Sequence, residues 1–321
     1  MQTPRSGKEK AMPVSESTLC AKAHIFRISR FHLMTCKNNR EKASFYKFYR
    51  TYIAKCLFIL YNISVDIERN RFLMGKVCLF VSGKGGAGKT TVCVNLAVAL
   101  ALRGKHVLVI DGDIWLRNAD ILLGLQNQAV LDVGDVFSGA CYFEKAVISH
   151  PEIGTLHFLA APARLRVPAD KMFGFISKLA DEQAEHYDFV FVDCPAGTSV
   201  CESDLVCRRH KAVVVSTADL TSLRDAERTA ETMKKKGLRD ARLVINKVDA
   251  SMIKKRLAPN IDEIIDSVSV RLIGVVPEDK LIPAYTYVGK FAYTSGAPKV
   301  RQAFSNIATR LCGGSAELIK L

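Results

Sequence analysis

Signatures of a metal site and of a disulfide framework are missing from this sequence. Its ten cysteines form no Cys-x-x-Cys pair. From their spacing we predict no histidine that would complete a metal site with any of them. Scattered cysteines of this kind are typical of reduced thiols in a cytosolic protein. A metal or redox role for Cys201 and Cys207, the close pair near the site predicted below, is a weak hypothesis. The cysteines stand at positions 20, 36, 56, 78, 93, 141, 194, 201, 207 and 312.

The chain also lacks an unbroken run of roughly 18 apolar residues, the length that a membrane-spanning helix needs. The longest candidate, Tyr52–Val65, is interrupted by Lys55 and Asn62. It also begins well beyond the first ~15 to 30 residues, where a cleaved secretory signal would stand. We therefore expect neither feature. The predicted location is cytoplasmic, with peripheral binding to the inner face of the plasma membrane left open.

The excess of positive charge is not spread evenly. Residues 1–73 carry 14 of the 46 basic residues and 5 of the 32 acidic ones, which is +9 of the net +14. Met74 stands directly before the first predicted strand, so we expect residues 1–73 to be a disordered extension or to come from a mis-assigned translation start. A basic, aromatic arm for nucleic acid or an anionic membrane, and an ordinary structured extension, are the alternatives. The predicted domain, residues 74–321, carries only +5, and nucleic acid is not an expected partner.

From Val77 onward, short β-branched runs alternate with helix-length amphipathic stretches. The predicted strands are Val77–Ser82, His106–Ile110, Leu156–Ala160, Phe189–Val192, Ala212–Ser216, Leu243–Ile245 and Leu272–Val276. The predicted helices include Thr90–Arg103, Ala169–Glu185, Leu223–Lys236 and Lys299–Leu311. Apolar strands that alternate with helices are typical of a parallel sheet covered on both faces. We predict an α/β fold with a doubly wound, mostly parallel sheet, whose ligand lies at the carboxyl ends of the strands.

A phosphate-binding pattern, Gly-x-x-x-x-Gly-Lys-Thr, follows the first predicted strand directly. Its glycines let backbone N–H groups wrap around phosphates, while Lys89 is expected to reach the β and γ phosphates and Thr90 to bind Mg²⁺. The helix that follows adds the positive end of its dipole. The predicted nucleotide-binding residues of this loop are Gly83, Lys84, Gly85, Gly86, Ala87, Gly88, Lys89, Thr90 and Thr91.

Carboxylates end two of the predicted strands. Asp111 and Asp113 stand two residues apart, a spacing that turns both toward the same side of a strand end. Asp193 ends the apolar run 189–192, which is the Walker B arrangement. Mg²⁺ prefers oxygen ligands and keeps several waters. The predicted metal residues, acting partly through water, are Thr90, Asp111, Asp113 and Asp193. A purely structural role for the first two carboxylates is the alternative.

Lys84, directly after the first glycine, makes this loop resemble the deviant Walker A motif of the MinD and ParA ATPases. The resemblance covers Met74 to about Gly314 and is closest to the MinD branch, in the segments 113–118, 195–197 and 276–279. It implies an ATPase with ATP and Mg²⁺ as cofactors, used as a molecular switch. In that family the early lysine reaches the nucleotide of a second subunit, which implies a homodimer on ATP. Lys84, Lys89 and Asp113 are then the expected catalytic residues.

The same resemblance assigns the loops around the site. Asp113 belongs to switch I and helps to position the attacking water, and Trp115 stands where the family usually has glycine. Switch II consists of Pro195, Ala196 and Gly197.

Two later loops are expected to bracket the base, with the Asn246 amide on adenine and with Pro277 and Glu278 opposite. The sequence Asn246-Lys-x-Asp249 also serves guanine in small GTPases, but the deviant loop favours ATP.

The resemblance predicts a switch in placement of the division septum. Alternatives are a flagellar-number regulator, a ParA-like DNA-partitioning ATPase, a metal-centre insertion or iron–sulfur carrier ATPase, and a nucleotide-gated scaffold. The missing Cys-x-x-Cys pair speaks against the carrier. The segment Thr221–Arg228 resembles the family's partner-binding helix, or is an ordinary solvated face. After Gly314, two leucines and one lysine are too few for an amphipathic anchor, so a membrane is left open as a partner.

Overall fold

A computed structural model describes residues 76–320 of the chain. Residues 1–75 and 321 lie outside this part, and with them the predicted extension 1–73. The described strands form one sheet in the order β3-β4-β2-β5-β1-β6-β7-β8. Their bounds are β1 Lys76–Val81, β2 Val107–Asp111, β3 Ile148–Ser149, β4 Leu156–Leu159, β5 Phe189–Asp193, β6 Lys211–Thr217, β7 Asp240–Val248 and β8 Arg271–Pro277. Within these residues all pairings are parallel except that of β3 with β4.

The predicted doubly wound, mostly parallel sheet is thus confirmed. Each of the seven predicted strands is present with shifted ends, and the four predicted helices correspond to α3, α7, α9 and α14. The edge strand β3 was not predicted. The helices are α3 Lys89–Ala101, α4 Ala119–Leu122, α5 Val133–Ser138, α6 Phe143–Ala146, α7 Ala169–Gln183, α8 Ser199–Glu202, α9 Leu220–Lys235, α10 Ala250–Lys254, α11 Ile261–Ser267, α12 Ile282–Tyr287, α13 Ala292–Ser295 and α14 Pro298–Leu311.

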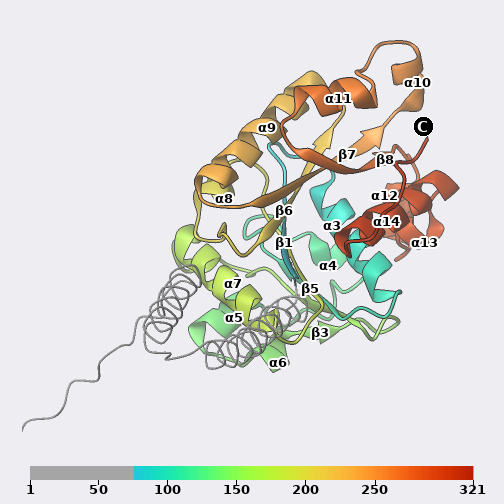
Figure 1. Ribbon diagram of the computed structural model, residues 1–321. Coiled ribbons are helices and arrows are strands. Elements are labelled where there is room, and N and C mark those ends of the chain that lie inside the picture. Colours follow the sequence, from blue (N-terminus) through green and yellow to red (C-terminus); the bar gives the residue numbers. More distant parts are fainter. Residues whose placement is uncertain (1–75, 321) are drawn as a thin grey trace, which may run out of the picture. The chain divides into compact units, whose positions relative to one another are not determined.

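The sheet separates two apolar cores, because successive strand residues point to opposite faces. In β1, Cys78 and Phe80 pack into the core that contains α3 and α14, whereas Leu79 and Val81 pack into the core that contains α7 and α9. Figure 1 shows these two helix pairs on opposite sides of the sheet. The central strands are therefore apolar on both sides, as the sequence pattern predicts.

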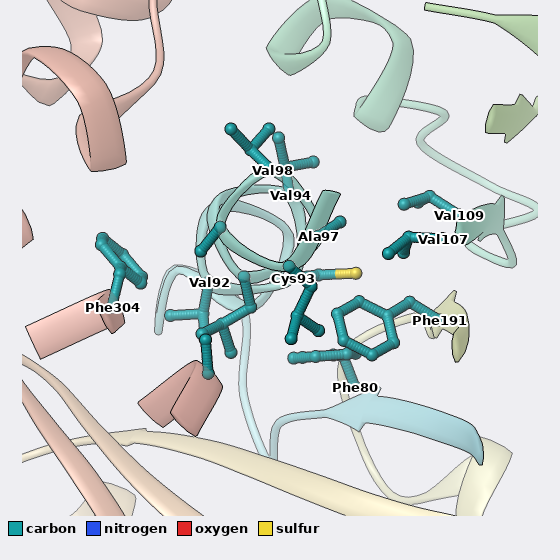
Figure 2. Close-up of a cluster of buried hydrophobic side chains, with 14 of the residues drawn as sticks. Phe80, Val92, Cys93, Val94, Ala97, Val98, Val107, Val109, Phe191 and Phe304 are labelled. Atoms are coloured by element: carbon teal, nitrogen blue, oxygen red, sulfur yellow. The ribbon is translucent and has the colours of Figure 1, made fainter. Parts of the chain in front are cut away.

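Helix α3 is buried on nearly all sides, which explains why its sequence is apolar all round rather than striped. Figure 2 shows Phe80, Phe191 and Val107 reaching it from the strands and Phe304 from α14. The rings of Phe80 and Phe191 lie 4.8 Å apart. Packing on both sides fixes α3 in place, and the loop at its amino end is fixed with it.

No helix in the described part of the chain combines the length and the apolar character that a membrane crossing requires. Beyond α14, the chain folds back on this helix. Arg310 Nε donates to the Ala316 carbonyl oxygen at 2.9 Å, and Asn306 Nδ2 donates to the Glu317 carbonyl oxygen at 2.8 Å.

Candidate nucleotide site

The loop between β1 and α3 depends on its glycines. Gly86 and Gly88 have φ angles of 83° and 84°, a left-handed conformation that other residues rarely adopt. A Cβ added at Gly88 would lie 2.3 Å from Asn246 Nδ2, and one added at Gly83 would lie 2.5 Å from Asp225 Cβ. By contrast, a Cβ at Gly86 would meet no atom within 4 Å. The loop is thus tightly packed against the protein at Gly83 and Gly88 and open at Gly86. A loop that binds phosphates needs such an open side.

Lys89 lies beneath this loop, in the first turn of α3. Its Nζ atom is 2.8 Å from Asp193 Oδ1 at the end of β5, and the two side chains are only 7% and 1% exposed. Thr90 Oγ1 lies 3.5 Å from the same nitrogen. Burial lowers the pKa of Lys89, but the Asp193 carboxylate outweighs it and raises the pKa overall. Lys89 is therefore a fixed cation at the carboxyl edge of the sheet.

Asp111 and Asp193 stand side by side, because they are register partners at the ends of β2 and β5. Burial and the neighbouring Asp193 charge raise the pKa of Asp111 to about 7. Its carboxylate accepts hydrogen bonds from the N–H groups of Asp113, at 3.0 Å, and Ala119, at 3.1 Å. A cation beside two crowded carboxylates would favour their ionised forms. With the Thr90 hydroxyl nearby, this donor set of oxygens fits Mg²⁺.

The predicted switch I, which contains Asp113, follows β2 directly. Asp113 is almost completely buried, and its Oδ1 atom accepts hydrogen bonds from the N–H groups of Trp115, at 3.4 Å, and Leu116, at 3.2 Å. Ile114 is buried, whereas Trp115 and Leu116 are 55% and 67% exposed. The Trp115 ring contacts the Phe173 ring, with the two centroids 6.0 Å apart. The carboxylate is thus held by its own loop, and the loop presents an apolar surface.

The predicted switch II, residues 195–197, lies beside the beginning of the phosphate loop. Cys194 N–H donates to the Phe80 carbonyl oxygen at 3.0 Å, and Gly197 N–H donates to the Ser82 carbonyl oxygen at 2.9 Å. Gly197 has a φ angle of 97°, which a residue with a side chain would resist. A shift of either loop therefore disturbs hydrogen bonds of the other.

Asn246 braces the phosphate loop from the end of β7. Its side chain is buried, and its Nδ2 atom donates to the Ala87 carbonyl oxygen at 2.9 Å. Lys247 adds a second brace, because its Nζ atom donates to the Gly86 carbonyl oxygen at 2.8 Å. The sequence did not reveal these contacts. The contact of Asn246 with adenine stays a prediction.

The other predicted base loop lies next to the end of β7, because Glu278 N–H donates to the Val248 carbonyl oxygen at 3.0 Å. Pro277 ends the adjacent strand β8. Contacts of these two residues with a base also stay predictions.

Lys84 stands apart from Lys89. Its Nζ atom lies 3.4 Å from Asp219 Oδ1, and the two side chains are 43% and 51% exposed. Asp219 is the N-cap of α9, where it accepts a hydrogen bond from Ser222 N–H at 2.9 Å. Although burial acts in the opposite direction, the hydrogen bonds from Ser222 and Thr217 hold the pKa of Asp219 well below its ordinary value. Lys84 therefore pairs at the surface with a carboxylate whose pKa is lowered.

Comparison with known protein families identifies the domain that contains this site. Residues 78–289 fit the pattern of the CobQ/CobB/MinD/ParA nucleotide binding domain, which spans β1 to the end of α12. The chain belongs to this family. The CobQ/CobB/MinD/ParA pattern thus includes every residue of the predicted site, from Gly83 to Glu278.

The chain is also similar to individual members of the MinD branch. It is 32% identical to the septum site-determining protein MinD of Bacillus subtilis over 246 residues, which are 76% of this chain and 92% of that protein. Among solved structures, a chain of the MinC:MinD cell division protein complex of Aquifex aeolicus shares 31% identity at a TM-score of 0.69, over 77% of this chain and 99% of that one. MinD of Pyrococcus horikoshii complexed with Mg-ADP shares 27% identity at a TM-score of 0.65, over 74% and 96%. The resemblance stated from the sequence is confirmed.

Proposed function

We propose that this chain is a MinD-like ATPase that binds Mg-ATP, dimerises around it and hydrolyses it as a switch in placing the division septum. Its relatives in Bacillus subtilis and Aquifex aeolicus, named for septum placement and cell division, support this assignment. The observation that carries the proposal is the contrast between two lysines of one loop. Lys89 is buried in an ion pair, whereas Lys84 is half exposed at the surface.

The two lysines suit different tasks. Lys89, already desolvated beside Asp193, is placed for the phosphates of the nucleotide in its own subunit. An exposed ion pair contributes only about 0.2 to 1 kcal/mol. The pair of Lys84 with Asp219 therefore costs little to break, and Lys84 can turn toward a nucleotide held by a second copy of the chain.

The residues around Lys89 divide the remaining work. When bound, Mg²⁺ would neutralise charge that develops on the transferred phosphate. Thr90, Asp111 and Asp193 would hold this ion, partly through water. Asp113 would orient the attacking water from switch I, where backbone N–H groups of its own loop hold its carboxylate.

The face of α9 formed by residues 221–228 is the proposed docking surface for a protein activator or inhibitor. Thr221, Arg224 and Arg228 are exposed there, while Leu223 and Ala226 face the core. Asp225 packs against Gly83 of the phosphate loop. A protein bound to this face would thus sense the state of the nucleotide loop directly.

The test is the mass of the full chain by light scattering with ATP and with ADP. The wild type is expected to form dimers with ATP alone, and Lys84→Ala is expected to remain monomeric while still binding ATP. Lys105→Ala is the matched control, because Lys105 also forms an exposed ion pair, with Asp188 at 3.3 Å. Asp219→Asn keeps an N-cap acceptor but releases Lys84, and is expected to dimerise at least as well as the wild type. Dimers of Lys84→Ala on ATP would refute the proposed role of this lysine.

A further inference from the structure

A second polar cluster lies at the amino edge of the sheet, opposite the nucleotide site. The loop that joins α8 to β6 places Cys207 and His210 beside Asp181, near the end of α7. One ligand atom from each of the three residues lies within 4.8 Å of the others. The ring of His210 is 0% exposed, while the other two side chains are partly buried. Neither the predicted site nor the family assignment accounts for this cluster.

The orientation of His210 is fixed by its backbone neighbour. Its Nδ1 atom lies 2.8 Å from the Leu205 carbonyl oxygen, so Nδ1 donates its proton there. Nε2 is left on the side of Asp181, 3.1 Å from Oδ1. Metal-binding histidines commonly donate the other ring N–H to a backbone carbonyl in this way, which fixes the tautomer. A catalytic triad would instead need an acid, not a carbonyl, at one nitrogen and a thiol at the other.

Asp181 is also held from behind. Arg209 forms an ion pair with Oδ2 of Asp181, which leaves Oδ1 facing the cluster. Carboxylates that bind metals are usually hydrogen-bonded by such an outer partner. Two of the three ligands are therefore already oriented by residues that would not touch the ion themselves.

The separations are close to those of a tetrahedral zinc ion. Zinc bonds of about 2.0 Å to nitrogen and oxygen and 2.3 Å to sulfur place neighbouring ligands roughly 3.3 to 3.6 Å apart. The distance of 3.1 Å from Asp181 to His210 is near this range. Cys207 need approach by no more than about 1.2 Å, the difference between 4.8 Å and roughly 3.6 Å, since all three ligand atoms lie within 4.8 Å of one another. A partly exposed side chain on a loop can make this movement.

We propose that Asp181, Cys207 and His210 bind one zinc ion, with the fourth position taken by water or an external ligand. A thiolate with an imidazole favours zinc over the hard cation Mg²⁺. The ion would tie α7 to the loop before β6. Cys201 is outside this cluster, so the weak hypothesis that paired it with Cys207 is replaced by Cys207 with His210. The proposal does not rest on the proposed function.

The experiment is titration of the full chain with zinc chloride against a chromophoric chelator, together with cobalt(II) spectra. The wild type is expected to bind zinc with a dissociation constant of about micromolar or lower and to show a thiolate-to-cobalt band. Cys207→Ser is expected to bind one zinc fewer per chain and to lose that band. Arg209→Ala, which changes only the outer partner, is expected to weaken binding roughly tenfold. Cys141→Ser is the matched control, because Cys141 is also partly exposed but lies outside the cluster.

Counting zinc per chain separates this site from the cysteines at positions 20, 36 and 56, which every variant keeps. Melting temperatures without metal show whether Cys207→Ser folds. If it does not, Asp181→Asn with Arg209→Ala gives the same test. An unchanged zinc count and cobalt spectrum in Cys207→Ser would overturn the proposal, as would a wild type that binds no zinc at this affinity.

Discussion

The two edges of the sheet both contain a cluster of titratable side chains, but they differ in how the chain assembles them. At the carboxyl edge, each group lies at the end of a strand or in the loop that follows it directly. Asp111, Asp193 and the phosphate loop therefore come from short contiguous segments. At the amino edge, Asp181 meets Cys207 and His210 only because α7 packs beside the loop before β6. The groups at the strand ends can therefore be recognised from local sequence patterns, whereas the complete second cluster depends on a contact between α7 and a distant loop.

The two edges each contain a Lys–Asp ion pair, Lys89 with Asp193 at the carboxyl edge and Lys105 with Asp188 at the amino edge. Removing the lysine of the first pair is the change with the largest expected effect. Lys89→Ala removes the buried partner of Asp193 and the cation proposed for the phosphates, so ATP hydrolysis is expected to fall by about 100-fold or more. The loss also leaves a buried charge unpaired, which typically costs about 3 to 5 kcal/mol. Lys105→Ala removes an exposed cation at the amino edge and is expected to cost less than about 1 kcal/mol.

Phosphate release and urea unfolding of both variants measure these effects. Equal losses of ATP hydrolysis and of unfolding free energy in Lys89→Ala and Lys105→Ala would contradict the expected difference between the two edges.

Two glycines sharpen the comparison. Gly88 and Gly104 both have left-handed φ angles, 84° and 79°, but a Cβ at Gly104 would meet no atom within 4 Å. Gly104→Ala should therefore cost only the backbone strain, about 1 to 2 kcal/mol. Gly88→Ala adds a collision with Asn246 and is expected to lower ATP affinity at least about tenfold, because the loop must shift. Calorimetric titration with ATP would distinguish the two, and similar affinities would contradict the expected packing of Asn246.

A further expected effect, confined to the carboxyl edge, is a dependence of stability on pH. The pKa of Asp111 is raised from its ordinary value of 3.8 to about 7 in the folded chain. Between these two values the folded state binds more protons than the unfolded state, so stability falls as the pH rises. Asp111→Asn is expected to remove this part of the slope, and its melting temperature relative to wild type should be higher at pH 8 than at pH 5.

Asp188→Asn, at the amino edge, is the control for thermal melts at both pH values. A slope in Asp111→Asn equal to that of the wild type would show that another group causes the dependence.

Most of the fold could be predicted because its strands are buried on both faces and its long helices cover them. β3 could not, since Ile148–Ser149 is too short to show a period. The short helices α4 to α6, α8 and α10 to α13 were missed for the same reason. Within the site, the phosphate loop and the carboxylates were predicted from local patterns.

Contacts between distant segments were not predictable from such patterns. Nothing in the sequence pairs Lys84 with Asp219 or turns the Asn246 amide onto Ala87, because these contacts depend on how α9 and β7 pack. The spacing Cys207-x-x-His210 was the one local signal of the second cluster. It was passed over because the third member, Asp181, lies 29 residues before His210, in helix α7.

The position of Trp115 has a consequence for observing this protein in solution. It is the only tryptophan in the sequence, it stands two residues after Asp113, and half of its surface faces solvent. Its ultraviolet emission therefore reports on one loop alone, without a label. A change of wavelength or of quenching by acrylamide on addition of nucleotide would time a movement of the predicted switch I directly, separately from phosphate release.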